Sequence, residues 1–322
     1  MRRLAITVLS LMCASGAVLA DTPRDSPGTF TVGLENDLFG KGSDKHYTHG
    51  TEFTYVSDTL PRPLSRLPFY QLGDRGRFVW SLGQQMYTPS DISRRDLIEE
   101  DRPYAGWLFT SFGVLNEHLG RVRHVDKLEL ILGIVGPDSY AEDVQREVHR
   151  ITDSEMPAGW DNQLDDEVTF DIQYQRQWLL PLAGDHIDLV PQVITSVGTS
   201  QRFAGVGATF RFGSGLSADY GPPLIRPTAS GSHHFKQGQG FYWYLFVGAH
   251  GRYVDHNIFL DGNDDGDSHS VDRKEWVGDL QGGVVLGWSN WRITLTNIIR
   301  SREFDGQREP DEFGAVTITY RH

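Results

Sequence analysis

A residue that could perform acid–base chemistry, His149, lies four positions after Gln145, an amide that can donate and accept hydrogen bonds. On a helix this spacing places both side chains on one side, one turn apart. Histidine is the residue best suited to act as a general base near neutral pH. A lone histidine in a loop is nevertheless more often an ordinary surface residue. The chemical interpretation of His149 therefore depends on what surrounds it.

The sequence around His149 predicts an amphipathic helix. Val144, Val148 and Ile151 follow one another at helical spacing and form an apolar stripe beside the polar one. Ser139 and Glu142 have the spacing of a capping box, which predicts the helix start.

Further along the chain, Pro157 and Gly159 are expected to end the helix before Trp160. The indole of Trp160 could pin the helix against a neighbouring surface.

Three polar clusters accompany this helix in the sequence. The first comprises 34–39 and 47–50, the second 101–107, and the third joins Gln145 and His149 to 159–163. Each has a structural alternative. Asn36 and Asp37 fit ordinary turn chemistry, and for Asp101 and Arg102 we favour a turn with an ion pair inside the fold.

Alternating polar and apolar residues dominate the rest of the chain and predict strands with one polar and one apolar face. We count about 12, near 29–36, 46–57, 77–87, 104–116, 123–136, 166–179, 185–197, 202–213, 239–254, 272–288, 290–301 and 312–320. Their even number and length are typical of an all-β, antiparallel outer-membrane barrel. A secreted β-sandwich also alternates. The glycine, glutamine and paired charges on the polar faces favour the barrel.

The amino-terminal residues 1–20 resemble a secretory signal, with Arg2 and Arg3 before an apolar run. Their removal would leave a single domain, 21–322, without the chain's one cysteine, Cys13. It would also change the formal charge from −13 to −15, which argues against a nucleic-acid partner. No later segment has the roughly 20 apolar residues of a transmembrane helix. We therefore expect an exported protein of the outer membrane.

Strand parity gives each polar cluster a place. With both ends of the barrel in the periplasm, the odd-numbered connections are extracellular: 37–45, 88–103, 137–165, 198–201, 255–271 and 301–311. Parity places Thr48 inward and Asn36 on the lipid side, so Asn36 would have to curl inward or act through its backbone. Segment 214–238 would be an unusually long periplasmic turn.

Residues 261–272 fit the spacing of an EF-hand calcium loop, with Asp272 at the final position. The flanking residues read as strands and not helices. We therefore favour an acidic extracellular loop over an EF-hand, and do not assign the catalytic metal to it.

Taken together and in order, the three clusters and the later segment 260–263 closely resemble the lipid A 3′-O-deacylase family of Gram-negative outer membranes. The resemblance spans nearly the whole mature chain. It implies a 12-stranded barrel that hydrolyses an acyl ester of lipid A with the help of calcium. It also implies an active site between the barrel wall and the helix of an extracellular loop.

The resemblance also implies roles for individual residues. His149 would be the base that activates water, with Asn36 and Thr48 as further catalytic residues. Asp37 and Glu155 would bind calcium, and Gln145 would support the site. Where the family can carry a lysine, this chain has Arg94 or Arg95, and we expect Arg94 to position the substrate.

The leading functional hypothesis is thus a calcium-dependent esterase, with lipid A or lipopolysaccharide as substrate and outer-membrane lipids as surroundings. An outer-membrane phospholipase is one alternative, although no G-x-S-x-G nucleophile motif occurs. A non-enzymatic porin or structural barrel is the other. Helix placement separates the enzymes from the porin, because only catalysis requires His149 to approach Asp37.

Overall fold

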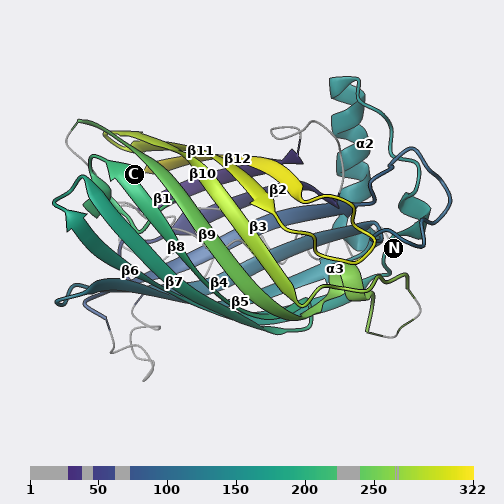
Figure 1. Ribbon diagram of the computed structural model, residues 1–322, viewed down its shortest axis with the longest axis horizontal. Coiled ribbons are helices and arrows are strands. Elements are labelled where there is room, and N and C mark those ends of the chain that lie inside the picture. Colours follow the sequence, from purple (N-terminus) through teal and green to yellow (C-terminus); the bar gives the residue numbers. More distant parts are fainter. Residues whose placement is uncertain (1–27, 38–45, 62–72, 223–239, 265, 267) are drawn as a thin grey trace.

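The structure is a computed structural model, which describes residues 28–37, 46–61, 73–222, 240–264, 266 and 268–322. Twelve antiparallel strands form a closed barrel in which consecutive strands pair and β1 closes on β12 (Figure 1). The expected signal, 1–20, lies outside the described residues.

The strands run nearly the full length of the barrel and alternate in direction. They are β1 (Thr29–Asn36), β2 (His46–Val56), β3 (Arg75–Thr88), β4 (Ala105–His118), β5 (Arg123–Val135), β6 (Glu167–Ala183), β7 (Ile187–Gly198), β8 (Gln201–Gly213), β9 (Phe241–Asn257), β10 (Trp276–Trp288), β11 (Trp291–Arg300) and β12 (Asp311–Arg321). The strand count predicted from alternation is confirmed.

Most strand limits agree with the sequence prediction within a few residues, but β10 begins at Trp276 and not at 272. The preceding residues are held differently, because Arg273 donates to the Asp261 carboxylate at 3.0 Å and to the carbonyl of Val254. The sequence pattern gives no sign of this side-chain clamp.

The two faces of the barrel wall have opposite chemistry. On β1, Phe30, Val32 and Leu34 are exposed, whereas Thr31 and Glu35 are buried. A band of exposed apolar side chains around a polar interior is what a lipid-embedded barrel requires. A β-sandwich would bury its apolar faces, so the barrel prediction is correct.

The extracellular mouth of the barrel is closed by the one-turn helix α3 (Ile258–Asp261), seen at the right-hand end in Figure 1. Ile258, Phe259 and Leu260 are fully buried there. The Phe259 ring stacks on that of inward-facing Tyr87, with centroids 4.3 Å apart. The mouth therefore contains a hydrophobic core.

The periplasmic end holds a second plug, formed by part of the long 214–238 segment. The 3₁₀ turn η6 (Leu216–Ala218) leads to Asp219, whose carboxylate binds Arg292 at 2.8 Å and also binds Arg211. Residues 223–238 of this segment lie outside the described part.

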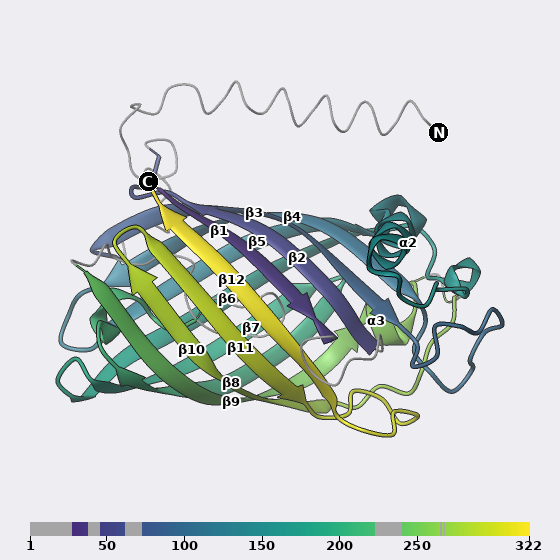
Figure 2. The ribbon, with the colours of Figure 1, turned by 90° about the horizontal axis from the view of Figure 1, so that it is seen from above.

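The helix expected around His149 is α2 (Ala141–Thr152), which follows the 3₁₀ turn η4 (Pro137–Ser139). It stands outside the wall at the extracellular end of β3 and β4, where Figure 2 views it nearly along its axis. No helix among the described residues is long and apolar enough to cross a membrane.

Both helix-boundary predictions need correction. Ser139 does not cap α2, because it belongs to the preceding turn and its carbonyl oxygen accepts from Gln84. The helix ends at Thr152, five residues before Pro157, where Asp153 takes a left-handed conformation (φ 55°). A left-handed residue at the C-cap stops the helix without proline.

Candidate active site between α2 and the outer wall

The polar stripe of α2, and not its apolar one, faces the barrel wall. Gln145 and His149 are buried together with Ala141. Val144, Val148 and Ile151 are 36%, 45% and 73% exposed. A helix that buries glutamine and histidine while it exposes valine and isoleucine is not placed by hydrophobic burial alone.

Trp160 attaches this polar stripe to the rim, as the sequence predicted. It lies in the 3₁₀ turn η5 (Trp160–Asn162), its indole N–H donates to Oε1 of Gln145 at 2.7 Å, and it is 1% exposed. Its ring packs against that of Tyr104, with centroids 4.9 Å apart. The indole therefore fixes both the position of α2 and the orientation of the Gln145 amide.

Gly106 lets α2 approach the wall. A Cβ atom at this position would lie 2.1 Å from the hydroxyl of Ser139 and 2.3 Å from the Cβ of Ala141. Any side chain on Gly106 would therefore push the start of α2 away from β4. The close contact explains the glycine in the second polar cluster.

A β-bulge in β2 changes the direction of Thr48. Tyr47 pairs with Tyr87 and His49 with Met86, so Thr48 is the extra residue between them. Its hydroxyl bonds that of Thr88 at 2.7 Å on the outer side. The parity prediction that Thr48 points into the lumen is wrong, because a bulge reverses parity locally.

The bulge and the docked helix together form one cleft on the outer wall, between α2 and the ends of β1, β2 and β3. It is lined by Asn36, Thr48, Gln145 and His149, with His49 and Met86 beside them. The cavity volume is about 30 Å³, enough for a water molecule. Asn36 has the outward parity expected for it, but it need not curl inward, because the cleft itself lies outside.

His149 is oriented by a carbonyl group. Its Nδ1 bonds the main-chain oxygen of Glu155 at 2.5 Å. Because a carbonyl can only accept, Nδ1 must carry the proton, and the lone pair is then on Nε2. This is the tautomer that a general base needs.

Gln145 presents a donor to the same cleft. Since an indole N–H can only donate, the amide oxygen of Gln145 must be the atom facing Trp160. Its Nε2 is thereby fixed at the other side, buried, with no hydrogen-bond partner among the described residues. A pre-oriented N–H of this kind can stabilise a carbonyl oxygen that becomes negatively charged.

The remaining predicted site residues are not among those lining the cleft. Asp37 follows Asn36 directly at the end of β1 and is buried. Glu155 is exposed, and it is its main-chain carbonyl that bonds His149. Arg94 is exposed and lines a separate small pocket with Pro103 and Tyr104. The cleft thus brings together Asn36, Thr48, Gln145 and His149, whereas Asp37, Glu155 and Arg94 are not among its lining residues.

The donor atoms near the cleft are suited to a hard cation. Asn36 and Thr48 offer amide and hydroxyl oxygens, and Asp37 supplies a buried carboxylate next to Asn36. Oxygen donors of these types are those that calcium prefers. The residues present are therefore compatible with a calcium ion.

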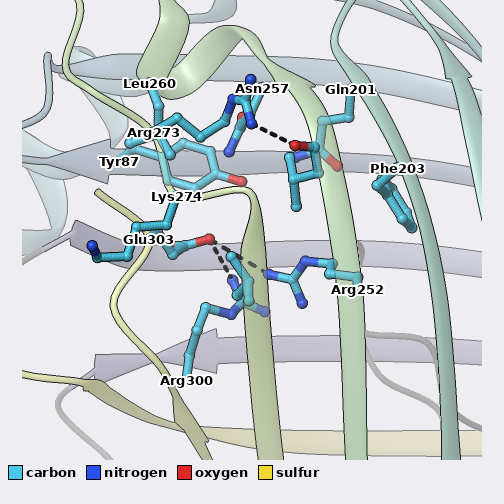
Figure 3. Close-up of a pocket in the computed structure, with 12 residues that line it drawn as sticks. Tyr87, Gln201, Phe203, Arg252, Asn257, Leu260, Arg273, Lys274, Arg300 and Glu303 are labelled. Atoms are coloured by element: carbon cyan, nitrogen blue, oxygen red, sulfur yellow. Dashed lines mark hydrogen bonds and ion pairs between the residues drawn. The ribbon is translucent and has the colours of Figure 1, made fainter. Parts of the chain in front are cut away.

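A second polar pocket lies inside the barrel, under the mouth (Figure 3). Arg252 and Arg300 both bind Asp279, at 2.7 and 2.8 Å, and both approach Glu303. Arg102 joins this group, 3.6 Å from Glu303 and stacked over Tyr87. The ion pair inside the fold that we favoured for the Asp101–Arg102 motif is present.

Asp101 itself ties the second extracellular loop to the rim. Burial raises the pKa of its carboxyl, but hydrogen bonds with His46 and from the hydroxyl and N–H of Ser90 outweigh burial and hold the pKa well below its ordinary value. Asp101 is therefore ionised and anchors the loop.

The EF-hand alternative is not supported by the described residues. Asp261 accepts from Arg273, lies 3.1 Å from His256 and accepts the N–H of Asn257. The flanking elements are β9 and β10, with only the single turn of α3 between them.

Sequence reasoning gave no site role to several residues that line the cleft, among them His49 and Ser154. Nε2 of His49 lies at a hydrogen-bond distance of 2.6 Å from the hydroxyl of Thr51, which gives the ring a fixed orientation. Ser154 reaches the cleft only because α2 ends early at Thr152. Neither the bulge nor the early helix end has a local sequence signature.

Comparison with known proteins identifies relatives of this fold. The family model described as outer membrane protein LpxR matches residues 4–322. The structure of LpxR from Salmonella typhimurium has 21% identity and a TM-score of 0.73, covering 91% of this chain and 99% of that chain. None of the curated protein sequences matches the chain.

More distant barrels are also similar. The β-domain of the Bordetella autotransporter BrkA has 11% identity and a TM-score of 0.41, covering 92% of this chain and 98% of that chain. The KdgM porin has 7% identity and a TM-score of 0.38, covering 91% and 98%.

Proposed function

The chain belongs to the LpxR family of outer membrane proteins, and from this we propose that it is a calcium-dependent lipid A 3′-O-deacylase. The observation that carries the proposal is the cleft outside the wall. Asn36, Thr48, Gln145 and His149 come from three separate segments and line one cavity. The resemblance in sequence had indicated the same four residues.

In the proposed reaction, a water molecule gives its proton to Nε2 of His149 as its oxygen attacks the acyl carbon. The carbonyl oxygen becomes negatively charged, and Nε2 of Gln145 donates a hydrogen bond to it. When the bond to the 3′ oxygen of the sugar breaks, the imidazolium returns the proton to that oxygen. The products are a carboxylic acid and a free 3′-hydroxyl.

Asp37 and Glu155 are the proposed calcium ligands, and Asn36 and Thr48 offer further oxygens in the cleft. Calcium would supply positive charge for the carbonyl oxygen. Glu155 can take this role only if its exposed side chain turns toward the cleft. Asp37 is therefore the better supported ligand.

The surroundings of the cleft suit a membrane lipid. Val144 and Val148 line it, and Ile151 extends the same apolar stripe outward. An amphipathic helix with its apolar side exposed at a lipid-embedded barrel can lie at the membrane interface. We propose that the acyl chain enters from the outer leaflet while Arg94 meets phosphate on the exposed saccharide.

The porin alternative has less support. The described part of the interior contains a hydrophobic core at the mouth, paired arginines below it and a second ion cluster at the periplasmic end. A water-filled channel needs an open lumen. The phospholipase alternative shares the proposed chemistry and differs only in substrate.

The deciding experiment is mass spectrometry of lipid A after incubation with the purified, folded barrel. We expect loss of the 3′-linked acyl group, no reaction in excess chelator, and better recovery with calcium than with magnesium. A parallel incubation with phospholipid is the control. Hydrolysis of phospholipid alone would replace the proposal with the phospholipase, and full activity in chelator would remove calcium from it.

A further inference from the structure

A cluster of two histidines and an aspartate lies at the opposite, periplasmic end of the barrel. His118 ends β4, and His124 and Asp126 lie near the start of β5. All three side chains have outward parity and are partly accessible, at 19%, 22% and 16% exposed. The proposed lipid A chemistry makes no use of them.

Strand register brings the two histidines together. His118 and His124 are direct cross-strand partners on either side of the 119–122 turn. Their rings are stacked, with centroids 4.1 Å apart and an interplanar angle of 10°. Asp126 is two residues further along β5, on the same face, and its Oδ2 is 3.1 Å from Nε2 of His118 and 3.9 Å from Nε2 of His124.

These distances are close to those of a metal site. Metal–ligand bonds of about 2.0–2.1 Å in a tetrahedral arrangement separate the ligand atoms by roughly 3.4 Å. The two nitrogen–oxygen distances lie on either side of this value. A ligand atom from each residue also falls within 4.8 Å of the others. Small side-chain rotations would suffice to bring them to bonding distance.

The neighbouring hydrogen bonds prepare the ligands. Nδ1 of His124 bonds the carbonyl oxygen of Val122 at 3.2 Å, so Nδ1 carries the proton and Nε2 has the lone pair. Asp126 is held by Arg176 and by the hydroxyl of Tyr174, which binds Oδ1 at 2.6 Å. Oxygen Oδ2 accepts from Arg176 at 2.9 Å and retains a second lone pair for a metal.

We propose that His118, His124 and Asp126 form a binding site for a divalent transition metal such as Zn²⁺ at the periplasmic rim. Two imidazole nitrogens with one carboxylate favour zinc, copper or nickel over calcium or magnesium. Water would complete the coordination, because the site is accessible. The bound ion would link β4 to β5 across their turn.

Isothermal titration of ZnCl₂ into the folded barrel in detergent micelles, after chelator treatment and its removal, tests this proposal. Because the chain has 12 histidines, the deciding quantity is the difference between variants. We expect His118→Ala with His124→Ala to remove one equivalent of Zn²⁺. Each single variant should weaken that site by at least about tenfold.

The matched control is His186→Ala. His186 is an exposed histidine at the periplasmic end, with its Nδ1 2.9 Å from a carbonyl oxygen, but it is not among the three clustered residues. The His186→Ala variant should bind Zn²⁺ with the same stoichiometry and affinity as the wild type. Co²⁺ provides a second readout, since a low-symmetry site gives visible absorption that the double variant should lose. Equal stoichiometry and affinity in the wild type and the double variant would overturn the proposal.

Discussion

Two polar regions lie at the extracellular end of this barrel, one in the cleft outside the wall and one beneath the mouth inside it. Beneath the mouth, the carboxylates of Asp279 and Glu303 form ion pairs with Arg102, Arg252 and Arg300. The described residues lining the outer cleft include no arginine or lysine. They include instead a histidine of fixed tautomer and an amide N–H pointing away from its anchor.

The difference between the two regions suggests different roles: the buried ion pairs stabilise the fold, and the cleft groups serve catalysis. Buried charges that neutralise one another hold strands together and leave little capacity for a substrate. Pre-oriented groups that do not neutralise one another can respond to charge that develops during a reaction. Substitutions inside the barrel should therefore affect stability, and those in the cleft should affect turnover.

The largest expected effect is that of His149→Ala in the cleft. Removing the proposed base should lower kcat by about 10²–10⁴-fold. The variant should still fold and insert, because His149 lies on a helix outside the barrel. The measurement is deacylation by barrels shown to be folded by heat-modifiable mobility. His186→Ala is the control, and near-wild-type turnover by His149→Ala would defeat the assigned mechanism.

The second largest expected effect is the loss of unfolding free energy when a buried ion pair of the interior is broken. Asp219→Ala leaves the fully buried Arg211 and Arg292 without this carboxylate, at a cost of about 3–5 kcal/mol in unfolding free energy. Urea titration of the folded barrel measures this cost. The control, Asp255→Ala, breaks an exposed pair with Arg202 and should cost about 0–1 kcal/mol. Asp219 lies at the periplasmic end, so a loss of turnover per folded Asp219→Ala molecule would contradict the view that buried ion pairs of the interior serve stability and not catalysis.

A sharper test separates the two roles of the Gln145 amide, in which Oε1 accepts from Trp160 and Nε2 faces the cleft. Gln145→Glu keeps an oxygen for the Trp160 indole but removes the N–H that faces the cleft. If this donor stabilises the developing charge, kcat should fall by about 10²–10³-fold while KM changes little. Unchanged kcat would show that Gln145 only anchors the helix.

The smallest expected effect is that of Trp160→Phe. This change leaves the cleft-facing N–H but removes the bond to Oε1, at a cost of about 1–3 kcal/mol in stability. The loss of kcat should be smaller than that of Gln145→Glu. If the two variants lose equal activity, orientation by Trp160 accounts for the whole contribution of Gln145.

The sequence alone determined the barrel. Alternation along 12 segments fixes which side chains face lipid and which face the lumen, because period two is a local property of extended chain. It also placed the helix and its anchor, since Gln145, His149 and Trp160 are close in the sequence. The resemblance to a known family then indicated which polar residues matter.

Tertiary structure decided where those residues meet. Thr48 points outward because of a bulge in the pairing of β2 with β3. The residues of β2 contain no sequence signal that predicts this bulge. The polar stripe of α2 turns to the wall because Trp160 and the space above Gly106 hold it there, against its hydrophobic pattern. Both outcomes depend on contacts between different segments of the chain, whereas a periodic pattern reflects only the conformation of each segment by itself.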